Sequence, residues 1–148
     1  MQITSPLKKI SKQIKKFLKI PFAEKKLFLE AVFYLFTAKI LLIIFPFKFC
    51  VQFITCKNCN KRNIDPEYLE LIKTALYRAN KLAFWKNICL VQSVAARWML
   101  QRRKIASQFS LGVAHDENKK VIAHAWVKVD DFEITHKGLD YNELINFK

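Results

Sequence analysis

The chain has 148 residues, of which 52% are hydrophobic, and it carries only two glycines. Such a length and hydrophobic content are typical of one domain with a buried core, and they exclude a disordered basic tail. Gly112 and Gly138 lie too far apart to form a glycine-rich phosphate-binding loop, so nucleotide folds built on such a loop are excluded as well.

The formal net charge of +14 belongs to the first two thirds of the chain. It is +7 over residues 1–26, zero over 27–47, +9 over 48–104 and −2 over 105–148. A basic chain can bind nucleic acid, but here the aromatic residues are scattered through apolar stripes and are not interleaved with Lys and Arg on one face. We therefore expect no nucleic-acid partner.

Residues 1–26 form a basic segment ahead of the domain predicted for residues 27–148. Apolar residues recur in this segment at helical spacing and lysines fill the other positions, which predicts an amphipathic helix that ends before Pro21. The apolar positions are Leu7, Ile10, Ile14 and Phe17. The first expectation is that this stripe packs on the domain itself; an anionic membrane surface and an acidic protein are the alternatives.

The next stretch, residues 27–47, is strongly apolar but contains Glu30 and Lys39. Its uncharged runs, residues 31–38 and 40–47, are much shorter than the roughly 20 apolar residues of a membrane-spanning helix. The pattern predicts a buried helix over residues 27–44 that is stopped by Pro46. No small-residue cleavage site follows the basic segment, so we expect a cytoplasmic protein, with peripheral membrane association left open.

Three of the four cysteines, Cys50, Cys56 and Cys59, lie close together, and the last two form a CxxC pair. The three thiolates suit zinc, but a second CxxC or an HxxxH pair is missing. We expect reduced, ordinary thiols in a loop and neither a metal nor a cofactor. A structural metal and a redox pair are the alternatives.

Two helices are predicted in the middle of the chain. Asp65 and Pro66 are typical of a helix start, and the helix is expected to run to about residue 81. Asn87 caps a second predicted helix, which ends in a run of cations at residues 102–104. Cys89 then lies in the first turn, where the helix dipole and unpaired backbone N–H groups favour a thiolate and can bind an oxyanion. This is a suitable place for a cysteine nucleophile.

From residue 107 the hydrophobic period changes from helical to alternating. Strands are predicted over residues 109–113, 121–129 and 132–136, with turns between them, and they form an antiparallel meander. His124 and Trp126 share one face of the middle strand. From there His124 can reach the Cys89 helix and act as its base, although a lone histidine in a strand is more often a packed residue than a catalytic one.

Cys89 at the start of an arginine-ended helix, followed by the string Ala123-His124-Ala125-Trp126-Val127, resembles the transglutaminase-like leader peptidases of lasso-peptide biosynthesis. The resemblance extends over about residues 27–137. It implies an α+β fold of the papain/transglutaminase type, with N-terminal helices packed on a small antiparallel sheet. It also implies that Cys89 is the nucleophile and His124 the general base.

Members of that family usually carry an aspartate about a dozen residues after the histidine, where this chain has His136. A two-residue turn at Asp130 and Asp131 pairs Glu133 with Lys128, too far along the strand from His124 for a hydrogen bond. The candidates for the third residue are therefore His136, which a three-residue turn brings onto the catalytic face, and Asp140, just past Gly138.

The resemblance implies a cysteine endopeptidase that removes the leader peptide from a ribosomally synthesised lasso-peptide precursor. The implied partners are the leader peptide, a separate peptide-recognition protein and a lasso cyclase, because residues 1–26 are too short for a recognition module. Two alternatives belong to other classes. One is a basic module that binds a membrane or nucleic acid, and the other is an inactive transglutaminase-like scaffold.

Overall fold

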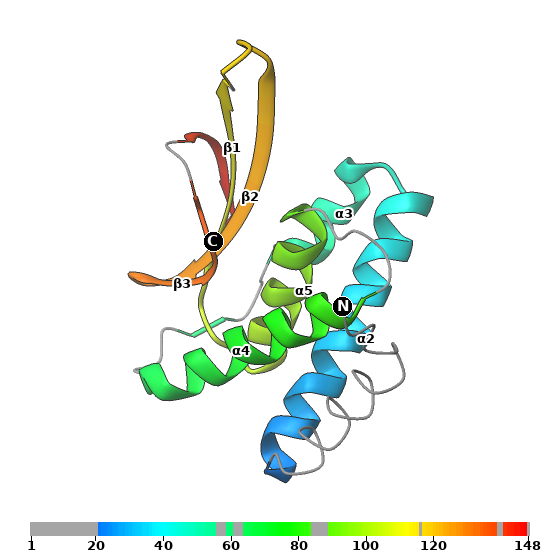
Figure 1. Cartoon of the computed structure of the whole chain (residues 1–148), viewed down its shortest axis with the longest axis vertical. Coiled ribbons are helices and arrows are strands. Elements are labelled where there is room, and N and C mark those ends of the chain that lie inside the picture. Colours follow the sequence, from blue (N-terminus) through cyan, green and yellow to red (C-terminus); the bar gives the residue numbers. More distant parts are fainter. Residues whose placement is uncertain are drawn as a thin grey trace, which may run out of the picture.

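The computed structural model describes residues 21–55, 59–60, 64–83, 89–115, 117–138 and 141–147. The helices come first along the chain and the strands follow, as Figure 1 shows. The elements are α2 (Phe22–Ile44), α3 (Phe47–Ile54), α4 (Pro66–Leu82), α5 (Cys89–Arg102), β1 (Gln108–His115), β2 (Val121–Val129), β3 (Phe132–Thr135) and β4 (Asn142–Phe147). This confirms the predicted α+β class. The predicted basic helix before Pro21 and the Asn87 cap lie outside the described residues.

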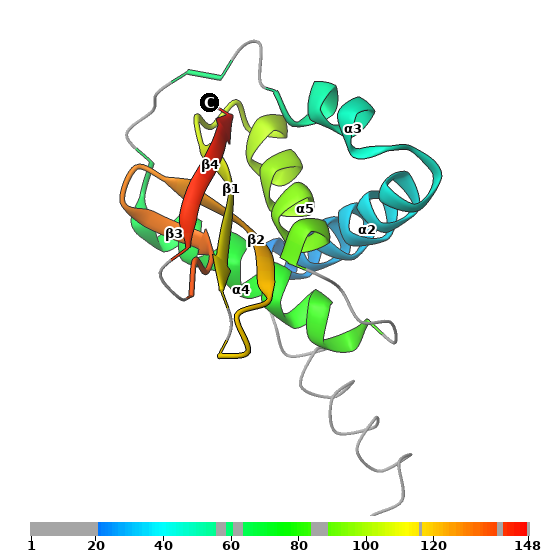
Figure 2. The same ribbon diagram turned by 90° about the horizontal axis from the view of Figure 1, so that it is seen from above.

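The Cys89 helix, α5, is the central element of the molecule. It packs against α2 and α4 on one side and against β2 and β3 on the other, so that in Figure 2 it lies between α2 and the sheet. Its buried residues therefore face several directions and are mostly small or unbranched at this crowded position. They are Val91, Ser93, Val94, Ala95, Ala96, Arg97, Met99 and Leu100.

The apolar helix α2 begins at Phe22 and ends at Ile44, because Phe45 adopts an extended conformation before Pro46. The helix and its end agree with the sequence, but the prediction that it is buried is wrong for one of its sides. Leu27, Ala31 and Leu35 are buried, whereas Phe33 is 63% exposed. It is the one helix in the described part of the chain that is long and apolar enough to cross a membrane.

Pro46 is also the N-cap of a short helix, α3, which was not predicted from the sequence. Cys50 lies in this helix with its side chain buried, and not in a loop as expected. The last carbonyls of α3 accept hydrogen bonds from α5: Trp98 Nε1 donates to Phe53, and both Arg97 Nε and Gln101 Nε2 donate to Ile54. Side chains of the central helix thus satisfy the carbonyls that a helix end leaves unpaired.

The sheet is antiparallel, with the strand order β3-β2-β1-β4. The three predicted strands are confirmed, and a fourth, β4, pairs with the free edge of β1. Strand β4 was not predicted, because its residues are exposed except for Phe147 and it lacks the alternation of a half-buried strand. The buried face of the sheet, which includes Phe109, Ala125 and Val127, packs on the helices.

Candidate active site

Cys89 is the first residue of α5, as the sequence predicted to within the first turn. Its thiol points at the carbonyl oxygen of Ala123 on β2, with a distance of 4.0 Å from Sγ to the oxygen. Because the first N–H groups of a helix have no intrahelical acceptor, the Cys89 amide is free of a helical hydrogen bond. The sulfur therefore lies at the positive end of the central helix, directly beside the strand that carries His124.

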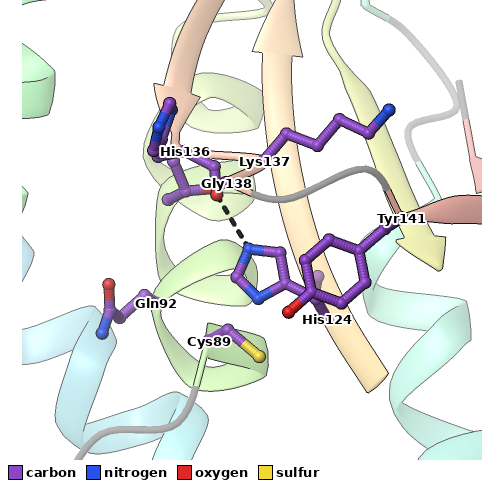
Figure 3. Close-up of a pocket in the computed structure, with 9 residues that line it drawn as sticks. Cys89, Gln92, His124, His136, Lys137, Gly138 and Tyr141 are labelled. Carbon is purple, nitrogen blue, oxygen red and sulfur yellow. Dashed lines mark hydrogen bonds between the residues drawn. The ribbon is translucent and has the colours of Figure 1, made fainter. Parts of the chain in front are cut away.

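Cys89 and His124 line the same pocket, which has a volume of about 370 Å³. The two residues predicted as a pair are thus brought together by the packing of α5 on β2. The rest of the lining comes from α5, from β2 and from the segment between β3 and β4 (Figure 3). These residues are Gln92, Ala125, Thr135, His136, Lys137, Gly138 and Tyr141.

The ring of His124 is held by a main-chain group. Its Nε2 lies 2.8 Å from the carbonyl oxygen of His136. A carbonyl can only accept, so Nε2 carries the hydrogen, and in the neutral ring the lone pair is on Nδ1. Figure 3 shows Nδ1 on the edge of the ring turned toward Cys89. This is the tautomer that a base for the Cys89 thiol requires.

The His136 side chain, one of the two predicted candidates for a third residue, points away from His124 (Figure 3). It is exposed, and its Nδ1 lies 2.5 Å from Oε2 of Glu133. In the structure, position 136 therefore contacts His124 through its backbone and not through its imidazole. Asp140, the other candidate, lies outside the described residues.

Glu133 supports the segment that carries this carbonyl. Its Oε2 also accepts a hydrogen bond from the Lys137 amide. Burial alone would raise the pKa of Glu133, but the hydrogen bonds from His136 and Lys137 and the positive charges of His136 and Lys73 hold it below its ordinary value. The carboxylate thus acts at a distance from His124, by closing the turn over residues 133–137.

A bulge in the β2–β3 hairpin places His136. The pairing starts as predicted, with Val129 opposite Phe132 and Lys128 opposite Glu133. The register then shifts, so that Thr135 lies opposite Val127. An unbroken register would place Thr135 on the face of His124, but the extra residue reverses the faces and puts it on the face of Val127. A three-residue turn was expected to be needed to bring residue 136 onto the face of His124. The register shift brings it there with the two-residue turn unchanged.

Buried hydroxyl groups fix the bulge against the Cys89 helix. Ser93, one turn after Cys89, donates to the carbonyl of Ala125 at 2.9 Å, and its Oγ lies 3.0 Å from Oγ1 of Thr135. Thr135 Oγ1 in turn accepts from the Val127 amide at 2.8 Å. Ser93 and Thr135 thus connect the helix of the candidate nucleophile to the residues that flank His124 and precede His136.

Aromatic rings cover the other side of His124. Tyr141, just before β4, stacks on the imidazole with ring centroids 4.8 Å apart, and the Trp126 ring lies 6.2 Å away. Trp126, which was predicted to share this face with His124, is buried and shields the face from water. Gly112 makes room for it, because a Cβ there would lie 2.8 Å from the ring.

Sequence reasoning missed Ser93, Thr135, Tyr141 and the role of Gly112. A serine one turn after Cys89 was a signal for the first, since a hydroxyl on a buried helix face needs a partner. Thr135 depends on the bulge and Tyr141 on the unpredicted strand β4, so neither could be placed by alternation alone.

The cysteines outside the pocket have different surroundings. Cys50 donates to the Phe45 carbonyl at 4.0 Å, and burial raises its pKa. Cys59 is disulfide-bonded, contrary to the expectation of reduced thiols, and is therefore not a thiolate ligand for zinc. Cys56 lies outside the described residues.

A comparison with protein families gives one match, to the family model described as the Transglutaminase-like superfamily, over residues 36–145. No curated protein and no solved structure matches the chain significantly. The matched residues run from the middle of α2 into β4 and contain both Cys89 and His124. Helices that deliver a cysteine to a small antiparallel sheet bearing a histidine agree with this match. The chain belongs to the Transglutaminase-like superfamily.

Proposed function

We propose that this protein is a cysteine endopeptidase that removes the leader peptide from a ribosomally synthesised lasso-peptide precursor. The observation that carries the proposal is the shared pocket of Cys89 and His124, in which the His136 carbonyl holds Nε2 and leaves Nδ1 as the base. Peptidase chemistry is consistent with the superfamily, and the leader as substrate rests on the resemblance of the Cys89 helix and the histidine strand.

In the first half of the proposed reaction, Nδ1 of His124 takes the proton of the Cys89 thiol. The thiolate then attacks the carbonyl carbon of the last leader residue. The Cys89 N–H, at the positive end of α5, donates to the oxyanion that forms. Throughout this step Nε2–H remains bound to the His136 carbonyl, which stabilises the imidazolium in its orientation.

In the second half, the imidazolium gives its proton from Nδ1 to the departing amine, which is the new N-terminus of the core peptide. The C–N bond breaks and the leader remains on Cys89 as a thioester. His124 next accepts a proton from a water molecule that attacks the thioester, and the leader leaves with a free carboxylate. The proton returns to the thiolate, and the enzyme is restored.

The same proposal includes two protein partners. A separate peptide-recognition protein binds the leader and presents it to the pocket. A lasso cyclase that consumes ATP takes the freed amine of the core peptide. Leader removal and cyclisation both take place in the cytoplasm.

The proposal is tested with the full chain, a precursor peptide from a neighbouring gene and its recognition protein, with masses as the readout. We expect wild type to release leader and core, and Cys89→Ala to leave the precursor uncut. Cleavage by Cys89→Ala at the wild-type rate would contradict the assignment.

A second measurement does not depend on the choice of substrate. Iodoacetamide is expected to alkylate Cys89 in the native protein, and His124→Gln to slow this reaction about tenfold or more, because the base is lost. The buried thiol of Cys50 is the internal control, and it should remain unlabelled until the protein unfolds. Equal rates for wild type and His124→Gln would remove His124 from the mechanism.

A further inference from the structure

The side of α2 that faces away from the protein core is apolar and exposed. Side chains on it recur every three or four residues, so they lie in one row along the helix. We define the apolar face by Leu29, Phe33, Phe36, Ile40 and Ile43, of which Phe33 is 63% and Ile43 71% exposed. Two further exposed phenylalanines, Phe49 and Phe53, lie on α3, which contacts α2.

We propose that the apolar face docks on an anionic membrane surface, with α2 lying in the plane of the membrane. A row of this length, roughly 20 Å at 1.5 Å per residue, is more than the scattered apolar residues of an ordinary soluble surface. A helix with one apolar side and cations near its edges is the usual form of an interfacial anchor.

The opposite side of α2 excludes a membrane-spanning arrangement. Leu27, Ala31 and Leu35 are buried in the protein core. The carboxylate of Glu30, also buried, accepts two hydrogen bonds of 2.7 Å from the guanidinium of Arg103, the residue just after α5. A helix with half its circumference in the core and a buried ion pair near its middle cannot be surrounded by lipid. The helix α2 can, however, lie on a membrane surface with its apolar face in contact with the lipid.

Charge decides between a membrane and a second copy of the chain. Lys26 and Lys48, both exposed, lie near the two ends of the apolar face. The whole chain carries a net charge of +14, so two copies repel each other when their faces meet. An anionic lipid surface attracts the same charge, and long lysine side chains can reach the headgroups while their stems remain on the apolar face.

Docking in this orientation leaves the candidate active site open. In Figure 2, α5 separates α2 from the sheet. The pocket is lined by residues of α5, of the sheet and of the segment after β3, and by none of α2. The membrane would therefore contact the molecule on the side away from Cys89 and His124.

The test is flotation of the full chain with phosphatidylcholine vesicles in which one third of the lipid is phosphatidylserine. We expect wild type to float with these vesicles and to bind at least about tenfold more weakly to phosphatidylcholine alone. The variant Leu29→Gln/Phe33→Gln/Ile43→Gln should lose at least about tenfold in affinity, because it removes apolar area from the contact. These side chains are exposed, so its circular dichroism and melting temperature should match those of wild type.

The matched control is Val121→Gln/Leu144→Gln, which changes two equally exposed apolar residues of the sheet and should bind as wild type does. Binding of the triple variant at wild-type strength would overturn the proposal, since the contact would then lie elsewhere in the chain. Failure of wild type to float would also overturn it. If wild type is dimeric in solution and the triple variant is monomeric, a second copy of the chain covers the apolar face, and the membrane proposal is wrong.

Discussion

His124 takes its orientation from backbone geometry more than from any side chain. Its Nε2 donates to a carbonyl, its Nδ1 is turned toward Cys89, and Tyr141 stacks on its ring. The residue that aims the carbonyl is Glu133, which binds both the imidazole of His136 and the amide of Lys137. The Glu133 carboxylate thus contributes to the site without contacting His124, by holding the segment whose carbonyl binds the histidine.

This role of Glu133 predicts a pH-dependent stability. Because its pKa is lower in the folded protein than in the unfolded chain, its stabilising effect is complete above the unfolded value of about 4.5 and is lost as the pH falls through the folded value. Glu133→Gln should therefore be less stable than wild type at neutral pH, and the difference should shrink in acid. Urea midpoints of both proteins on either side of that range measure it.

Glu70→Gln, on the exposed surface of α4, is the control for this measurement and should change the midpoint little at any pH. A difference between wild type and Glu133→Gln that stays constant into acid would show that the carboxylate's charge does not hold the turn.

At the scale of elements, the pocket depends on how β1, β2 and β4 meet around Gly112. Gly112 pairs with His124 across β1 and β2, and the pairing with β4 shifts register next to it. A Cβ at this position would lie 2.7 Å from the carbonyl oxygen of Asn142, the residue after Tyr141. The absence of a side chain at one position therefore allows both Trp126 and β4 to approach.

Gly112→Ala should consequently destabilise the protein, by about 1–3 kcal/mol as for other overpacked sites. It should also slow alkylation of Cys89, because displacement of β4 moves Tyr141 away from His124. Chemical denaturation and the iodoacetamide rate are the measurements. The usual effect of alanine for glycine within a strand is a gain in stability, so a gain would contradict the close approach.

The main elements follow from the sequence because their signals are local. Asp65 accepts from the Glu67 amide and caps α4, with Pro66 in the first turn, as predicted. The alternation of Val121 to Val129 likewise predicts β2. The bulge before Thr135 and the edge strand β4 follow from packing against α5 and β1, which no local pattern encodes. For the same reason the sequence indicates Cys89 and His124 but not the His136 carbonyl that holds the histidine ring.

Across the whole molecule, one helix, α5, contacts every layer. Its N-terminus carries Cys89, and in its middle Arg97 donates to the Ile54 carbonyl at the end of α3. Arg103, the residue just after its C-terminus, binds Glu30 of α2. Burial alone would lower the pKa of Arg103, but its hydrogen bonds to Glu30 and Tyr68 and their charges raise it. The ion pair therefore fixes α2, and with it the apolar face, against the core.

Glu30→Gln should accordingly cost about 3–5 kcal/mol, because it leaves the partly buried Arg103 without its counter-charge. The matched control is Glu24→Gln, which breaks the more exposed pair between α2 and Arg78 and should cost no more than about 1 kcal/mol. Urea unfolding of the three proteins gives the two differences. Equal losses would mean that burial of the Glu30 pair adds nothing.

The His136 carbonyl that holds His124 has a consequence for the sequence evolution of such proteins. Every amino acid supplies a main-chain oxygen, so substitutions at position 136 can leave the partner of the histidine in place. The amino acid is instead constrained at the positions that set the orientation of this oxygen. Examples are Thr135 at the bulge and Gly138, which has a positive φ of 77°. Searches that demand an aspartate at this point would overlook relatives that orient their histidine in the same way.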